Sequence, residues 1–178
     1  GYDRSHLSIP ESHIKLIEEV AKVQPNVVVV LCNGAPVEMP FADKCTAILE
    51  SYLGGEASGS AIADILFGAA NPCGKLAETF PEKLEHNPSY GNFGNYNGKV
   101  YYSEGVMVGY RWYDTRKIKP LFPFGYGLSY TSFEYSNLRI EDCGDCNFTV
   151  TCDITNTGKR AGKEIVQLYV KNAAAAVM

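Results

Sequence analysis

The first hydrophobic pattern along the chain is that of an amphipathic helix. Apolar residues recur every three or four positions and form one face: Ile14, Ile17, Val20 and Ala21. Ahead of them, Ser8 is a candidate N-cap, Pro10 suits the first turn, and Glu11 favours the helix dipole and can complete a capping box. Because Pro25 cannot continue a helix, we expect this one to end just before it.

Extended patterns follow the predicted helix. Residues 27–31 form a β-branched run bounded by Pro25 and Gly34, which predicts a strand buried on both faces, as in a parallel sheet. Residues 45–53 contain a second predicted strand. The chain then reads as a helix over residues 60–67, which Gly68 ends, and a short strand over residues 76–80.

This order of elements is typical of an α/β fold. Ligands of such sheets bind at the carboxyl ends of the strands. The residues that follow the two predicted strands are Asn33 with Gly34, and Gly54, Gly55 and Glu56. The pattern therefore predicts binding chemistry at these two loops.

The pattern changes after residue 80. Residues 81–98 are rich in Asn, Gly and Pro and predict a long loop. The aromatic tract that follows suits either sugar rings or a core: Tyr101, Tyr102, Tyr110, Trp112, Tyr113, Phe122, Phe124, Tyr126, Tyr130, Phe133 and Tyr135. From residue 133 alternation predicts strands, the last over residues 165–170. We therefore divide the chain into residues 1–80, 81–132 and 133–178, with an uninformative tail at 173–178.

Composition narrows the class of protein. Apolar residues make up 46% of the 178 residues and charged residues 20%, a globular balance. The net charge of −4 offers no basic excess for binding nucleic acid. No apolar run approaches the roughly 20 residues of a membrane helix. The first residues lack the features of a signal peptide, and we expect the chain to be a fragment.

The six cysteines are scattered among apolar neighbours, which favours reduced thiols and a cytoplasmic protein. Cys143 and Cys146 have the spacing of half a zinc site, but no second such pair or nearby histidine follows, so no metal is predicted. A disulfide among Cys143, Cys146 and Cys152 stays an alternative. Residues 54–59 lack the Lys-Ser/Thr pair of a phosphate-binding loop, so no nucleotide cofactor is predicted.

Seven motifs in order resemble the C-terminal part of glycoside hydrolase family 3, the β-glucosidase group. They are NGAPV (33–37), GGEASGSAIADILFG (54–68), NPCGKL (71–76), YSEG (102–105), VGYRWYD (108–114), FPFGYGLSYT (122–131) and NTGKRAGKEIVQLYV (156–170). The similarity runs from residue 1 to about residue 171. Each motif alone is weak, but seven in one order are specific.

The resemblance implies the architecture and the reaction. It implies a partial α/β sandwich followed by an incomplete all-β domain of the fibronectin type III kind. The family's nucleophilic Asp lies on an N-terminal barrel, and its acid/base Glu precedes a Gly-Tyr-Asp-Arg sequence that matches residues 1–4 here. The acid/base is thus expected immediately before Gly1. The implied protein is a retaining β-glycosidase, most simply a β-glucosidase, without a cofactor.

The implied partners are a β-linked glucoside or oligosaccharide and the barrel portion, on the same enzyme or on a partner chain. By itself this chain is expected to be inactive. The alternative from another class is a noncatalytic scaffold or carbohydrate-binding module that needs a partner chain.

Four residues of the chain are local candidates for site chemistry. Glu104 stands among aromatic residues and suits a general acid, or a structural acceptor for the backbone or Arg111. Glu56 suits a contact with a sugar hydroxyl, or a first-turn charge on the following helix. Asp3 and Arg4 suit substrate contacts, or an ion pair that holds the acid/base loop.

Overall fold

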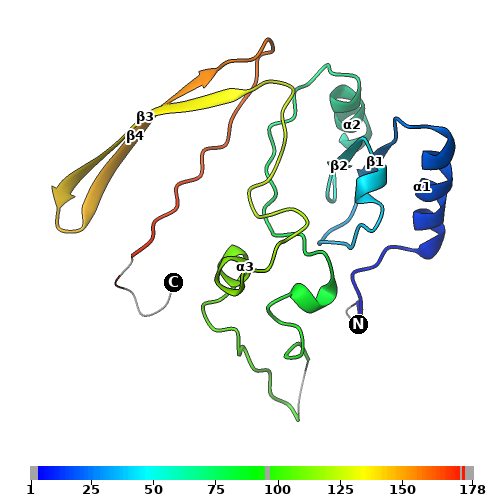
Figure 1. Ribbon diagram of the computed structural model, residues 1–178, viewed down its shortest axis with the longest axis horizontal. Coiled ribbons are helices and arrows are strands. Elements are labelled where there is room, and N and C mark those ends of the chain that lie inside the picture. Colours follow the sequence, from blue (N-terminus) through cyan, green and yellow to red (C-terminus); the bar gives the residue numbers. More distant parts are fainter. Residues whose placement is uncertain (1–3, 95–96, 173, 175–178) are drawn as a thin grey trace. The chain divides into compact units, whose positions relative to one another are not determined.

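The structure, a computed structural model, describes residues 4–94, 97–172 and 174. The chain forms two compact units: one contains residues 1–59, 76–126 and 168–178, and the other contains residues 60–75 and 127–167. Helices and small sheets alternate along the first half, and a long hairpin occupies the second unit (Figure 1). The expected mixed α/β class is confirmed. No described helix has the length and apolar character needed to cross a membrane.

The first unit opens with helix α1 (Glu11–Val23), which ends before Pro25 as expected. The predicted cap is wrong: Pro10 takes the N-cap position without a side-chain hydrogen bond. The Ser8 hydroxyl instead donates to Glu38 at 3.2 Å, and Ser8 pairs with Glu38 in an isolated β-bridge. This pairing holds residue 8 in extended backbone beside residue 38, too far from the helix for capping.

Strands β1 (Val28–Leu31) and β2 (Ala47–Glu50) form the predicted parallel pair, with Leu31 opposite Glu50. The expectation of burial on both faces is wrong for Val28, which is 49% exposed. The described sheet has only these two strands, and along β1 burial increases from the exposed Val28 to the buried Leu31. The short helix η1 (Ala42–Lys44) lies between the strands.

A small apolar core underlies the sheet. Phe41 and Phe80 are fully buried, and Leu31, Val37 and Met39 complete the cluster. Ile14 and Ile17 of α1 pack against it, as their helical spacing predicts. The predicted strand over residues 76–80 is wrong: only Phe80 forms a bridge, with Phe122. At this side of the core, two loop segments are therefore joined by the single bridge between Phe80 and Phe122.

The aromatic tract contains an element that its composition does not indicate. Residues Tyr110–Arg116 form helix α3, whose Tyr113 is buried. The long loop before it holds one short helix, η2 (Leu84–His86), and the Trp112 indole donates to the His86 carbonyl at 3.0 Å. The aromatic residues are not all core residues: Tyr113 is buried, whereas Tyr102 is 79% exposed.

Helix α2 (Ser58–Leu66) begins two residues earlier than predicted, and Gly68 follows it with φ of 77°. Most of α2 belongs to the second unit, in which Lys75 and Glu164 form an ion pair at 3.4 Å with side chains 16% and 14% exposed. Lys75 also donates to the Gly127 carbonyl at 2.6 Å. A Cβ atom at Gly127 would lie 2.4 Å from the Gly74 carbonyl oxygen, so this approach requires glycine.

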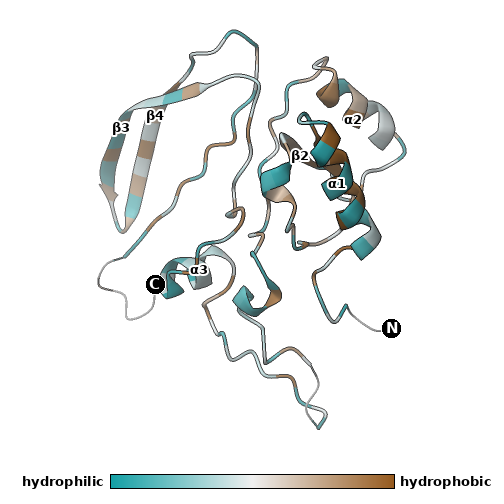
Figure 2. Cartoon of the chain, turned by 45° about the vertical axis from the view of Figure 1, so that its right-hand side comes forward, coloured by the Kyte–Doolittle hydropathy of each residue, from teal (hydrophilic) through white to brown (hydrophobic). Residues whose placement is uncertain are grey.

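The predicted β region forms one antiparallel hairpin, β3 (Phe133–Gly144) and β4 (Asn147–Asn156). Hydrophobic and hydrophilic segments alternate along both strands (Figure 2). The predicted strand over residues 165–170 is wrong, because the structure assigns no strand there.

The hairpin leads to a prediction about the isolated chain. Leu138, Ile140 and Phe148 are 67%, 67% and 59% exposed, and exposed apolar strands favour edge pairing and association. We expect the isolated 178-residue chain to bind a hydrophobic dye and to elute as oligomers. Light scattering coupled to gel filtration measures the mass. Substituting Ile140→Thr and Phe148→Thr should reduce both signals, whereas a wild-type monomer with one sharp unfolding transition would contradict the expectation.

Candidate functional site

The carboxyl ends of β1 and β2 bring together the polar residues of the first unit. The side-chain amide of Asn33, two residues beyond β1, donates to Glu50 Oε2 at 3.0 Å. The backbone amide of Tyr52 donates to Glu50 Oε1 at 2.8 Å. Glu50, the last residue of β2, therefore joins the loops that follow both strands.

The loop after β1 is held by further contacts. Asn33 Nδ2 also donates to the Ala35 carbonyl at 2.8 Å, which closes a tight turn. A Cβ atom at Gly34 would lie 3.1 Å from Leu53 Cδ1. This tight approach to the second loop favours glycine at position 34. The two loops are thus in contact through both polar and apolar atoms.

Tyr52 carries backbone strain at this edge of the sheet. Its φ is 49°, in the left-handed region that a bulky side chain rarely adopts. Its hydroxyl is buried next to the Ala77 amide but forms no hydrogen bond of normal geometry with any residue that the structure describes. Burial, together with the charges of Glu78 and Glu50, raises the pKa of Tyr52. Such strain persists only where surrounding contacts enforce it.

Two carboxyl groups share this environment. Burial raises the pKa of Glu50, the Glu78 carboxylate adds to the increase, and the bonds from Tyr52 and Asn33 oppose it. Burial also raises the pKa of Glu78, whose side chain has no hydrogen-bond partner in the described part of the chain. Both acids therefore keep their protons to higher pH than usual.

The predicted site residues are not assembled into one cluster. Arg4 is exposed and donates to the Pro36 carbonyl at 3.4 Å. Asp3 lies outside the described residues. Glu56 is exposed in a turn two residues before α2, so the expected first-turn charge on that helix is wrong. Over residues 4–94 and 97–172, no hydrogen bond or ion pair joins Arg4, Glu56 and Glu104.

Glu104 is half-buried in a turn over residues 103–106. Its backbone carbonyl accepts from the Met107 amide at 2.9 Å. The expected bond between its side chain and Arg111 is not formed among the described residues. Among the described residues, no hydrogen bond or ion pair engages the Glu104 carboxyl.

Sequence reasoning also pointed to this sheet edge but did not include three of its residues. Asn33 was among the predicted positions, while Glu50, Tyr52 and Glu78 were not. The available signal was Glu50 itself, a charged residue that directly ends a predicted strand. Nothing in the sequence near Glu78 indicates that its loop returns to this edge.

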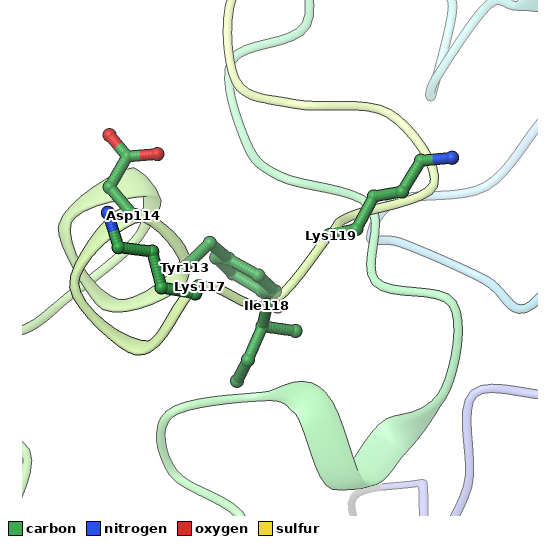
Figure 3. A pocket seen from close by; sticks show the side chains of 5 residues that line it. All are labelled: Tyr113, Asp114, Lys117, Ile118 and Lys119. Carbon is green, nitrogen blue, oxygen red and sulfur yellow. The ribbon is translucent and has the colours of Figure 1, made fainter.

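Other features carry no site chemistry. No group of three or more His, Cys, Asp or Glu side chains within the described ranges is arranged to hold a metal ion. Figure 3 shows an open pocket beside α3, lined by Tyr113, Asp114, Lys117, Ile118 and Lys119. It contains none of the predicted site residues.

Comparison with known proteins decides the family. Residues 1–130 match the model of the glycosyl hydrolase family 3 C-terminal domain. The chain belongs to this family. It is 59% identical over 180 residues to thermostable beta-glucosidase B from Acetivibrio thermocellus, covering 99% of this chain and 24% of that protein.

Solved structures of beta-glucosidases are similar in fold. A beta-glucosidase from Streptomyces venezuelae in complex with D-glucose has a TM-score of 0.87 at 42% identity, over 91% of this chain and 21% of that one. A beta-glucosidase from Kluyveromyces marxianus in complex with glucose has a TM-score of 0.85 at 41% identity, over 89% and 19%. The family 3 chain described here thus spans about a fifth to a quarter of the length of its relatives.

The raised pKa of Glu78 predicts a pH-dependent stability difference. A carboxyl whose pKa is higher in the folded than in the unfolded state destabilises the fold when it is ionised. The destabilisation disappears as the pH falls through the folded-state pKa to the ordinary value of 4.5, because the carboxyl is then protonated. We expect Glu78→Gln to raise the melting temperature at pH 7 and to lose this advantage near pH 4.5. Thermal unfolding followed by circular dichroism measures the difference, and an advantage independent of pH would contradict the assignment.

Proposed function

We propose that the protein containing this chain is a retaining β-glucosidase that hydrolyses β-glucosides from the non-reducing end. The observation that carries the proposal is the family match over residues 1–130, together with 59% identity to a protein named a beta-glucosidase. Two of the similar solved structures are described as complexes with glucose, which supports a glucose-type sugar at the site.

The proposed reaction divides its chemistry between parts of the protein. Retaining hydrolysis needs a nucleophilic carboxylate and an acid/base carboxyl about 5 Å apart. In this proposal the nucleophile comes from a barrel domain, and the acid/base is the residue immediately before Gly1. The coverage of relatives, 24% or less for those described above, supports such a division because most of their length lies outside the matched region.

Within this chain, residues 1–80 and 81–132 belong to the α/β domain in the proposed protein. Residues 133–178 belong to the start of a fibronectin type III-like domain. The family match ends at residue 130, close to the second boundary, which supports that division. Arg4 and Asp3 contribute to the substrate side of the acid/base loop, and Glu56 reaches a sugar hydroxyl.

The activity is tested with a chromogenic β-glucoside. We expect the full-length protein to hydrolyse it and to release β-glucose first, as proton NMR of the fresh product reports, because two displacements retain configuration. The isolated 178-residue chain should show no turnover. Inactivity of the full-length protein towards β-glucosides, or turnover by the isolated chain, would contradict the proposal.

Two variants locate the acid/base. Replacing the residue before Gly1 by one without a carboxyl should lower the rate on a phenyl glucoside by at least about 10²-fold, the usual contribution of general acid catalysis. Glu104→Gln serves as the comparison in the same protein. A loss of that size from Glu104→Gln, with little loss from the other variant, would assign the acid to Glu104.

A further inference from the structure

The Glu50 carboxylate is fully engaged by the chain itself. One oxygen accepts from the Asn33 side chain and the other from the Tyr52 backbone amide. A carboxylate with both oxygens bound in this way is poorly placed to donate a proton to a substrate. Glu50 instead acts as a clamp, because it holds together the loop after β1 and the loop after β2. The clamp fixes the position of the loop after β1.

That loop supports the segment at the start of the chain. The Asn33 amide binds the Ala35 carbonyl, and the next carbonyl, that of Pro36, accepts from Arg4. Val37 is buried in the core. One residue later, the Glu38 amide donates to the Leu7 carbonyl at 2.9 Å. Residues 4–8 therefore lie along residues 36–38 and are joined to them by several hydrogen bonds.

Topology explains why these segments meet. Helix α1 precedes β1 and packs against the core through Ile14 and Ile17, so its first residue lies towards the carboxyl end of the strand. The segment that leads into α1 consequently lies beside the loops that follow β1 and β2. Glu50 is the residue that ties these two loops together.

We propose that Glu50 is a positioning residue for β-glucoside hydrolysis: through Asn33 it fixes the loop that holds Arg4 and the segment leading from the acid/base residue. The inference rests on the proposed function. Loss of the clamp leaves the Asn33 amide and the Tyr52 amide short of an acceptor and frees residues 33–36. The acid/base then loses orientation, while the nucleophile on another domain is unaffected.

The leaving group of the substrate separates positioning from general damage. Phenyl β-glucoside needs proton donation as its bond breaks, whereas 2,4-dinitrophenyl β-glucoside has a leaving group that departs without it. In the full-length protein, Glu50→Gln should lower kcat/KM for the phenyl substrate roughly tenfold, because small misplacements of a catalytic group cost one to two orders of magnitude. The value for the dinitrophenyl substrate should fall less than about twofold.

Two further variants complete the experiment. Asn33→Ala breaks the same connection without touching an acid, and it should reproduce the selective loss even if Glu50→Gln does not fold. Glu18→Gln is the control, because Glu18 joins α1 to η1 through an exposed ion pair with Lys44, and it should change neither value. Melting temperatures confirm that each variant tested is folded.

The outcomes are distinct. Equal losses on both substrates, or no loss in Glu50→Gln or in Asn33→Ala, would overturn the positioning role. A wild-type protein that hydrolyses neither substrate would instead overturn the proposed β-glucosidase activity.

Discussion

The bond between the Glu50 carboxylate and the loops on either side of it is the constraint on which the first unit depends. Two parallel strands alone are a marginal sheet, and the loops at their carboxyl ends need a common anchor. Glu50 provides it by accepting from Asn33 and Tyr52 at 3.0 and 2.8 Å. The cost is a partly desolvated charge beside a second acid, Glu78, and a tyrosine held at positive φ. Such costs are usual at functional edges of a sheet.

The elements that sequence reasoning predicted are those whose signals are local. Helix α1 follows from the spacing of Ile14 and Ile17 and from Pro25, and β1 follows from a run of four valines. The parallel pairing follows from the order of elements. Binding chemistry at the loop of Asn33 stays a prediction, based on the position of binding sites in such sheets. The hairpin β3–β4 likewise shows period-two alternation.

What the sequence did not indicate depends on partners far along the chain. Residues 165–170 alternate like a strand, but the structure assigns no strand there. Helix α3 was obscured because its aromatic residues have little helix preference and are stabilised instead by burial of Tyr113. Glu78 is separated from Glu50 and Tyr52 in the sequence by the whole of α2, yet its charge acts on both of them. No spacing within the sequence indicates that these residues lie close together.

In the second unit a carboxylate also joins separate segments, but its partner is an ammonium group instead of amide groups. Glu164 pairs with Lys75, both largely buried, and Lys75 also binds the Gly127 carbonyl, so one ammonium group joins segments more than fifty residues apart. Removing one partner of a buried pair costs several kcal/mol, because the other charge is left buried and uncompensated. In both units a partly buried carboxylate therefore joins segments that are distant in the sequence. The motifs that identify the family, NGAPV, NPCGKL and the run from residue 156 to residue 170, contain Asn33, Lys75 and Glu164.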